Sequence, residues 1–169
     1  MTANDPDKRD GAGRLSQRLA RNGDFSWRGD ASVPPFDDSR PLIVFDGVCV
    51  LCSSFARFVV THDPEGKFLL TAAQSRLGQA LYRHFQLDPV NFESNLLLAD
   101  GRPSAKMDAV AGIVSRLGMP WRLGAHAAAL PTGLSDWLYD RIARNRYRLF
   151  GRHEVCVRPD LTWRHRVIE

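Results

Sequence analysis

Apolar residues in this chain form short runs whose spacing changes from strand-like to helix-like. Residues 42–45 are four consecutive apolar residues, which is typical of a strand buried on both faces. After them, apolar residues recur with the spacing of one helical face, at Leu51, Phe55, Phe58 and Val59. The pattern predicts a buried strand followed closely by an amphipathic helix over residues 50–60.

Similar patterns continue along the chain. We expect strands over residues 67–71, 95–99 and 102–106, and helices over 76–85, 107–117, 121–130 and 134–150. Asp100-Gly101 is a hairpin signal between the last two strands. The order β-α-β-α-β-β-α predicts an α/β fold with a thioredoxin-like mixed sheet flanked by helices and additional C-terminal helices.

The length and composition divide the chain into an arm and a domain. The 169 residues, 44% of them hydrophobic, suit one globular domain with a substantial core. Residues 1–38 are rich in Asp, Arg, Gly and Ser, and Val33-Pro34-Pro35 predicts an extended connector. We therefore expect a poorly ordered arm over 1–38, pinned to the surface by Phe25, Trp27 and Phe36, and a domain over 39–169.

The chain shows no signal for export or for crossing a membrane. No apolar run approaches the roughly 20 residues that span a bilayer. Met1 to Gly13 contains no hydrophobic block, and its acidic residues do not fit a transit peptide. We therefore expect a cytoplasmic location and no membrane insertion.

Two of the three cysteines stand where thiols are reactive. Cys49 follows the first predicted strand and its Asp-Gly turn, and Cys52 lies nearly one helical turn further on. The free N–H groups and positive dipole end of a helix stabilise an anion, which lowers the pKa of the first thiol. This C-x-x-C spacing predicts thiol–disulfide exchange in which Cys49 attacks and Cys52 resolves, without a bound cofactor.

Asp46 lies just before the turn, and two interpretations of it remain open. As a functional residue it accepts the proton of Cys52, directly or through water. As a structural residue it forms the Asp-Gly turn and accepts N–H groups at the helix start. The sequence does not separate these roles.

The same cysteines also allow interpretations that involve no redox chemistry. Both can be small buried hydrophobic residues, or the pair can bind zinc within a non-catalytic, partner-binding domain. Structural zinc needs four ligands, and the remaining ones would be His153 and Cys156, which do not form a standalone zinc motif. Cys156 is otherwise a packing residue or a third redox thiol.

The excess positive charge lies at the C-terminal end. Residues 141–169 contain eight arginines and three acidic residues, a net charge of +5. On the helix expected there, a solvated basic face is the simpler interpretation, so we expect no nucleic-acid partner. A further hypothesis is that Arg144-Asn145-Arg146 folds back towards the cysteines and stabilises a thiolate or an anionic thiol substrate.

The segment from Phe45 to Cys52 resembles the signature of the DCC family of predicted thiol-disulfide oxidoreductases, whose name matches Asp46, Cys49 and Cys52. The likeness continues to the C-terminal pattern that includes Leu130-Pro131, Tyr139, the run from Ala143 to Tyr147, Phe150-Gly151-Arg152 and Cys156. It implies a thioredoxin-like fold, disulfide exchange, and a thiol or disulfide substrate that is a protein or a small thiol.

Two departures accompany this resemblance. Lys106-Met107 stands where the family pattern leads us to expect a small Gly-Ser-like pair. Thioredoxins also place a cis-proline opposite the cysteines at the start of a central strand, whereas no proline closely precedes the strand expected from Asn95. A protein substrate would therefore have one fixed backbone partner fewer.

Overall fold

A computed structural model describes residues 15, 18–19, 21–92, 94–124, 132–153 and 163–169. Within these residues the strands are β1 (Leu42–Phe45), β2 (Leu69–Ala72), β3 (Leu96–Ala99) and β4 (Arg102–Ala105). They form one mixed sheet in the order β2-β1-β3-β4, in which β1 is parallel to β2 and antiparallel to β3. This mixed sheet with flanking helices confirms the expected α/β, thioredoxin-like fold class.

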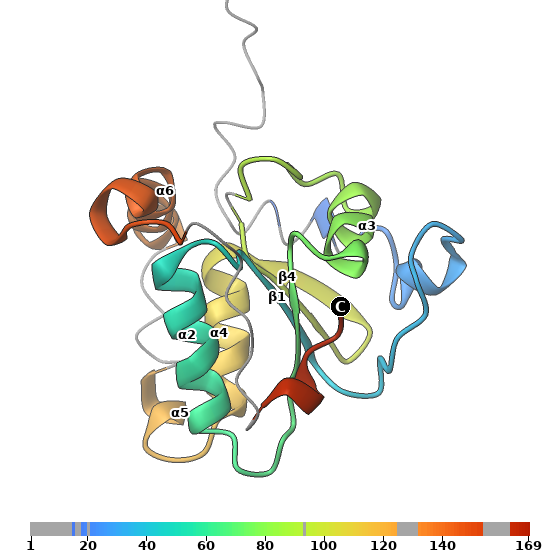
Figure 1. The fold of residues 1–169 in the computed structure, drawn as a ribbon, viewed down its shortest axis with the longest axis horizontal. Coiled ribbons are helices and arrows are strands. Elements are labelled where there is room, and N and C mark those ends of the chain that lie inside the picture. Colours follow the sequence, from blue (N-terminus) through green and yellow to red (C-terminus); the bar gives the residue numbers. More distant parts are fainter. Residues whose placement is uncertain (1–14, 16–17, 20, 93, 125–131, 154–162) are drawn as a thin grey trace, which may run out of the picture.

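The helices form layers on the two faces of the sheet (Figure 1). Helices α2 (Val50–Thr61) and α4 (Lys106–Arg116) lie on one face, and α3 (Arg76–His84) lies on the other. The short α5 (Trp121–Gly124) follows α4, and the longer α6 (Thr132–Phe150) lies near the start of α2. The helix expected over 121–130 is described only to Gly124, because its remaining residues lie outside the described part.

The central strand β1 connects the two halves of the core. All four of its residues are buried, as a continuous apolar run predicts. Leu42 and Val44 pack with α3 in one hydrophobic cluster, whereas Ile43 and Phe45 pack with α2 and α4 in the other. This alternation places the end of β1, and the turn after it, between the helical layers.

The expected hairpin between β3 and β4 is present. Asp100 and Gly101 both have positive φ, 53° and 78°, as a two-residue hairpin turn of this kind requires. Lys106, the first residue of α4, also has a positive φ of 54°. Glycine adopts this conformation more readily than lysine, which gives a backbone reason for the small residue expected at this position.

Part of the predicted arm packs against the core on the α3 side. The Trp27 side chain is 4% exposed, and Phe25 and Phe36 are partly buried against the same cluster, which confirms their predicted anchoring role. Ser26 and His84 share a hydrogen bond, and His84 is paired in turn with Asp30. The division of the chain at residue 38 stays a prediction.

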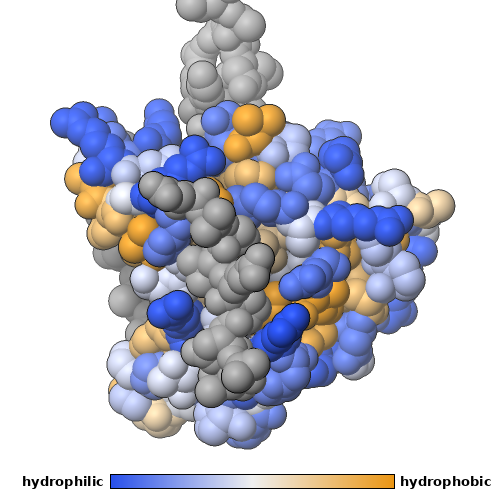
Figure 2. Space-filling model, in the orientation of Figure 1, coloured by the Kyte–Doolittle hydropathy of each residue, from blue (hydrophilic) through white to orange (hydrophobic). Residues whose placement is uncertain are grey.

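The surface over α6 combines two kinds of side chain. Hydrophobic and strongly hydrophilic residues lie next to each other there, in the upper left of the molecule (Figure 2). No helix in the described part of the chain is both long enough and apolar enough to cross a bilayer.

Candidate functional site

The two cysteines lie at the start of α2, as the sequence predicts. Cys49 is the N-cap residue, and its Sγ accepts a hydrogen bond from the backbone N–H of Cys52 at 3.3 Å. The carbonyl of Cys49 accepts the N–H of Ser53 at 2.9 Å, which is the first hydrogen bond of the helix. A thiolate at Cys49 would thus satisfy an N–H group that has no partner within the helix.

The surroundings separate the acidities of the two thiols. The pKa of Cys49 is lowered to about 7, mainly by the hydrogen bond from the Cys52 side chain, against the opposing effect of burial. The Cys52 N–H and the positive charge of Arg146 lower it further. The pKa of Cys52 is raised, because its thiol is hydrogen-bonded to Cys49 and because its partial burial disfavours the charged form. Of the two thiols, Cys49 is therefore the one that ionises first.

The cysteine with the lowered pKa is the less exposed of the two. Cys49 is fully buried, whereas Cys52 is partly exposed. The segment after α6 pairs with the backbone around Cys49: Arg152 forms an antiparallel β-bridge with Cys49, and the N–H of His153 donates to the carbonyl of Val48 at 2.8 Å. Charge thus favours Cys49 as the reactive sulfur, while access favours Cys52.

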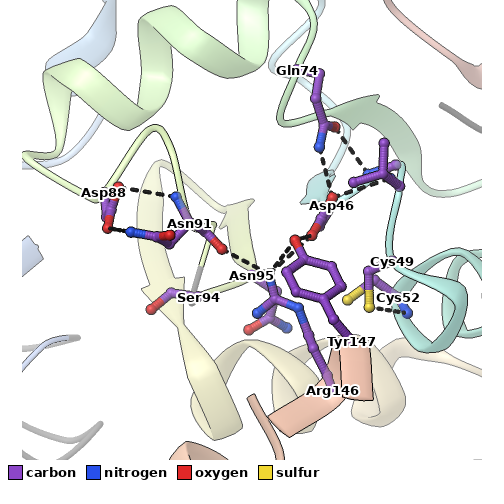
Figure 3. A network of polar contacts seen from close by, with 12 residues as sticks. Asp46, Cys49, Cys52, Gln74, Asp88, Asn91, Ser94, Asn95, Arg146 and Tyr147 are labelled. Carbon is purple, nitrogen blue, oxygen red and sulfur yellow. Dashed lines mark hydrogen bonds and ion pairs between the residues drawn. The ribbon is translucent and has the colours of Figure 1, made fainter. Parts of the chain in front are cut away.

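Asp46 is the centre of a buried polar network (Figure 3). Asp46 is only 2% exposed. Oδ1 accepts the N–H of Val48 at 3.1 Å and the Gln74 amide at 2.6 Å. Oδ2 accepts Arg146 Nη2 at 2.9 Å and the hydroxyl of Tyr147. The bond to Val48 is the turn contact that the structural interpretation predicts, and the proton-accepting role stays a prediction.

Arg146 is the residue of the Arg144-Asn145-Arg146 run that reaches the site. It is 4% exposed and also donates to the carbonyl of Asn91 at 2.9 Å. Arg144 and Asn145 instead donate to carbonyls of their own helix, at Asp140 and Arg141. One turn of α6 therefore sends one arginine inwards and another to the surface.

Gln74 is a member of this network that the sequence analysis did not predict. It lies two residues after the end of β2, and Asp46 directly follows the end of β1. Parallel neighbouring strands end at the same edge of a sheet, so a polar residue after β2 lies beside the polar residue after β1. That topological signal was sufficient to find it.

The start of β3 differs from the thioredoxin arrangement. Ser94 and Asn95 precede the strand, and the backbone N–H of Asn95 donates to the hydroxyl of Tyr139 at 3.3 Å. The same hydroxyl donates to the Asn95 side chain at 2.8 Å. This N–H group is therefore already engaged by α6 and is not free to bind a substrate backbone.

Of the two residues that the zinc-binding alternative adds to the cysteines, one lies in the described part of the chain and the other does not. His153 lies near Ser53, with 3.4 Å between Nε2 and Oγ, while Cys156 lies outside the described residues. Within the described ranges, no three His, Cys, Asp or Glu side chains gather in a way that could hold a metal ion.

Comparisons with known proteins agree on one family. A family model described as DCC1-like thiol-disulfide oxidoreductase matches residues 43–152. The chain is 36% identical over 118 residues to "Uncharacterized protein YuxK" of Bacillus subtilis (strain 168), covering 70% of this chain and 86% of the relative. It is 32% identical over 142 residues to "DCC family protein At1g52590, chloroplastic" of Arabidopsis thaliana, covering 83% of each. No solved structure gives a significant match.

Proposed function

The chain belongs to the DCC1-like thiol-disulfide oxidoreductase family, and from this premise we propose that it exchanges dithiol and disulfide through Cys49 and Cys52. The observation that carries the proposal is the hydrogen bond from the Cys52 N–H to Cys49 Sγ at the start of α2. It favours a thiolate on one sulfur and keeps the second within one helical turn.

The proposed reaction has two exchange steps. The Cys49 thiolate attacks one sulfur of a substrate disulfide, which forms a mixed disulfide and releases the first substrate thiolate. The Cys52 thiol then loses its proton and attacks the Cys49 sulfur, which forms the Cys49–Cys52 disulfide and releases the second thiolate. Two electrons pass to the substrate, and an external dithiol run through the same steps in reverse restores the cysteines.

Asp46 is the proposed acceptor of the Cys52 proton. Its four hydrogen bonds involve both carboxylate oxygens, so one donor must leave before the carboxylate receives a proton. Arg146 has a separate proposed role, since its positive charge favours the thiolate form of Cys49.

Exchange at Cys49 also requires movement of residues 151–153. The Arg152 bridge and the His153 hydrogen bond hold this segment beside the backbone of Val48 and Cys49. Two backbone contacts at the end of a helix are easily broken locally, so opening this segment costs far less than unfolding the domain.

Trapping the mixed disulfide tests which sulfur attacks. A Cys52→Ser variant should retain a substrate on Cys49 that peptide mass spectrometry identifies, and the matched Cys49→Ser variant should retain none. If the adduct forms on Cys52 instead, access rather than charge selects the nucleophile and the proposed order is wrong.

A redox titration tests the function as a whole. Equilibration in glutathione buffers should interconvert the dithiol and a Cys49–Cys52 disulfide. Thiols that remain unreactive in the folded protein, or stoichiometric zinc found by elemental analysis, would instead support a non-catalytic domain. The cytoplasmic location stays a prediction, and the name of one relative places that relative in the chloroplast.

A further inference from the structure

The outward side of α6 exposes several large apolar side chains. Trp137 is 61% exposed and Leu149 is 63% exposed. Three others on the same helix are also exposed: Leu138, Ile142 and Phe150. A cluster of this kind on one helix differs from the single exposed apolar residues found on most surfaces, and it indicates a contact surface.

The same helix surface is strongly basic. Residues 137–152 contain five arginines and one acidic residue, Asp140. Arg146 is buried against Asp46, and Asp140 is paired with Lys106 at 2.9 Å. The exposed charges of this stretch are therefore the arginines at 141, 144, 148 and 152.

Helical spacing arranges these residues in two neighbouring rows. One row follows i, i+4, i+7 and i+11 and contains Trp137, Arg141, Arg144 and Arg148. The second follows i, i+4 and i+11 and contains Leu138, Ile142 and Leu149. The pair of rows extends for about 20 Å along the helix axis. Figure 2 shows hydrophobic and hydrophilic residues next to each other over α6.

This basic-apolar face leads directly to the thiols. Gly151, with φ of 87°, ends α6 and turns the chain back. The next residue, Arg152, forms the β-bridge with Cys49. Its guanidinium lies 5.3 Å from the ring centre of Tyr147, whose hydroxyl donates to Asp46. A molecule held on this face thus has one end at the segment that pairs with Cys49.

We infer that this face is the docking surface for a protein disulfide substrate whose contact region combines carboxylates with apolar side chains. The inference rests on the proposed exchange reaction and names its substrate class. Carboxylates would pair with the arginine row and apolar side chains with the leucine-isoleucine row. It also supplies the substrate contact that the engaged Asn95 N–H at the start of β3 does not offer.

Two other occupants fit the face less well. Nucleic acid would use the arginines, but its phosphates leave the row of Leu138, Ile142 and Leu149 without a partner. An anionic membrane surface suits both rows, yet it presents no disulfide to the sulfurs where the face ends. A protein carrying a disulfide satisfies the charge, the apolar row and the position of the thiols together.

Synthetic peptides provide the test. Three peptides of equal length carry the same thionitrobenzoate mixed disulfide, flanked by Glu and Leu, by Lys and Leu, or by Gln and Leu. At low salt the reduced protein should react with the Glu-Leu peptide at least about tenfold faster than with the Lys-Leu peptide, because the arginine row attracts it. The difference should diminish in high salt, since exposed charges are screened.

Charge-reversal variants link the preference to α6. The Arg141→Glu and Arg148→Glu double variant should lose the preference but react normally with neutral bis(2-hydroxyethyl) disulfide. The matched control reverses Arg57 and Arg83, two exposed arginines on α2 and α3, and should keep the preference. Equal rates for the Glu-Leu and Lys-Leu peptides, or a preference that survives in the α6 variant, would overturn the inference.

Two further measurements separate docking from chemistry. Fluorescence anisotropy of a Glu-Leu peptide with the Cys49→Ser, Cys52→Ser protein reports docking alone, so absent binding refutes the inference. If the wild-type protein does not react with the neutral disulfide, the proposed function is refuted instead. If sedimentation with phosphatidylglycerol vesicles depends on α6 but peptide selectivity does not, the face binds membranes and the inference is wrong.

Discussion

The two cysteines share one helix start but differ in the groups that stabilise their charge. Cys49 Sγ receives both the backbone N–H and the side-chain donor of Cys52. Cys52 is the donor in that pair, so its own ionisation would remove a hydrogen bond and add a second negative charge. The asymmetry follows from position in the first turn of the helix.

Removing the Cys52 donor should therefore change the ionisation of Cys49. We expect Cys52→Ala to raise the pKa of Cys49 from about 7, because the side-chain hydrogen bond is its largest cause. Below this pKa the thiolate fraction falls as the pH falls, so the variant should lose thiolate at neutral pH. Thiolate absorbance against pH measures this without requiring access to the buried sulfur. Cys52→Ser, which keeps a hydroxyl donor, should shift less.

Substitutions of the two partners in the buried Arg146–Asp46 ion pair should shift the pKa of Cys49 in opposite directions. Arg146→Ala should raise it and Asp46→Asn should lower it, because the arginine stabilises the thiolate and the carboxylate opposes it. Arg146→Ala should also cost about 3–5 kcal/mol of stability, since it leaves Asp46 buried without its charged partner.

Two comparisons control for a purely structural effect of Arg146. Arg144→Ala removes an exposed arginine from the same helix and should change neither the pKa nor the stability appreciably. Arg146→Lys retains the charge and should keep the pKa of Cys49 low. A pKa unchanged in Arg146→Ala would show that this arginine only supports the fold.

At the scale of elements, α6 has a different role on each side. Its inward side brings Arg146 and Tyr147 to Asp46 and Tyr139 to the start of β3. Its outward side presents the basic-apolar face. The Lys106–Asp140 ion pair joins α4 to α6, and both of its side chains are largely buried. The start of α4 therefore contributes to the position of the helix that completes the site.

Lys106 provides a test of backbone strain at that junction. Both Lys106→Gly and Lys106→Ala lose the ion pair, but only glycine relieves the positive φ of 54°. We expect the glycine variant to be more stable than the alanine variant by about 1–2 kcal/mol, which reverses the usual preference for alanine in helices. Urea unfolding measures the difference in the free energy of unfolding between the two variants. A more stable alanine variant would show that the backbone at residue 106 is not strained.

At the scale of the whole molecule, the N-terminal segment belongs to the packing of the sheet. Trp27 lies in the same hydrophobic cluster as Leu42 and Val44 of β1, and it also packs edge-on against Phe85. Its indole N–H donates to Asp38 at 2.9 Å. Residues before the predicted domain start thus contribute to one face of the central strand.

Trp27→Ala should consequently destabilise the protein by about 3–5 kcal/mol, the cost of removing a large aromatic side chain from a core. Trp137→Ala is the matched control, because that side chain is exposed and its removal should change stability by less than about 0.5 kcal/mol. Thermal unfolding followed by circular dichroism compares them. Equal stabilities would mean that the segment before residue 39 is independent of the domain.

The sequence by itself determined the parts of this protein that depend on neighbouring residues. The apolar run of β1, the periodicity of α2 and the Asp100-Gly101 turn are local patterns, and all three elements are present as expected. The C-x-x-C spacing likewise placed Cys49 and Cys52 at a helix start, since that requires only a strand, a turn and a helix in succession.

The tertiary structure decided what surrounds the thiols. Arg146 is 100 residues from Asp46 in sequence, and only two residues along α6 separate its buried position from the exposed Arg144. The β-bridge between Cys49 and Arg152 also joins distant segments. Hydrophobic periodicity specifies which side of a helix is buried but not which groups meet there. Those pairings, and with them the charge and access of each sulfur, arise only when α6 packs beside the end of β1.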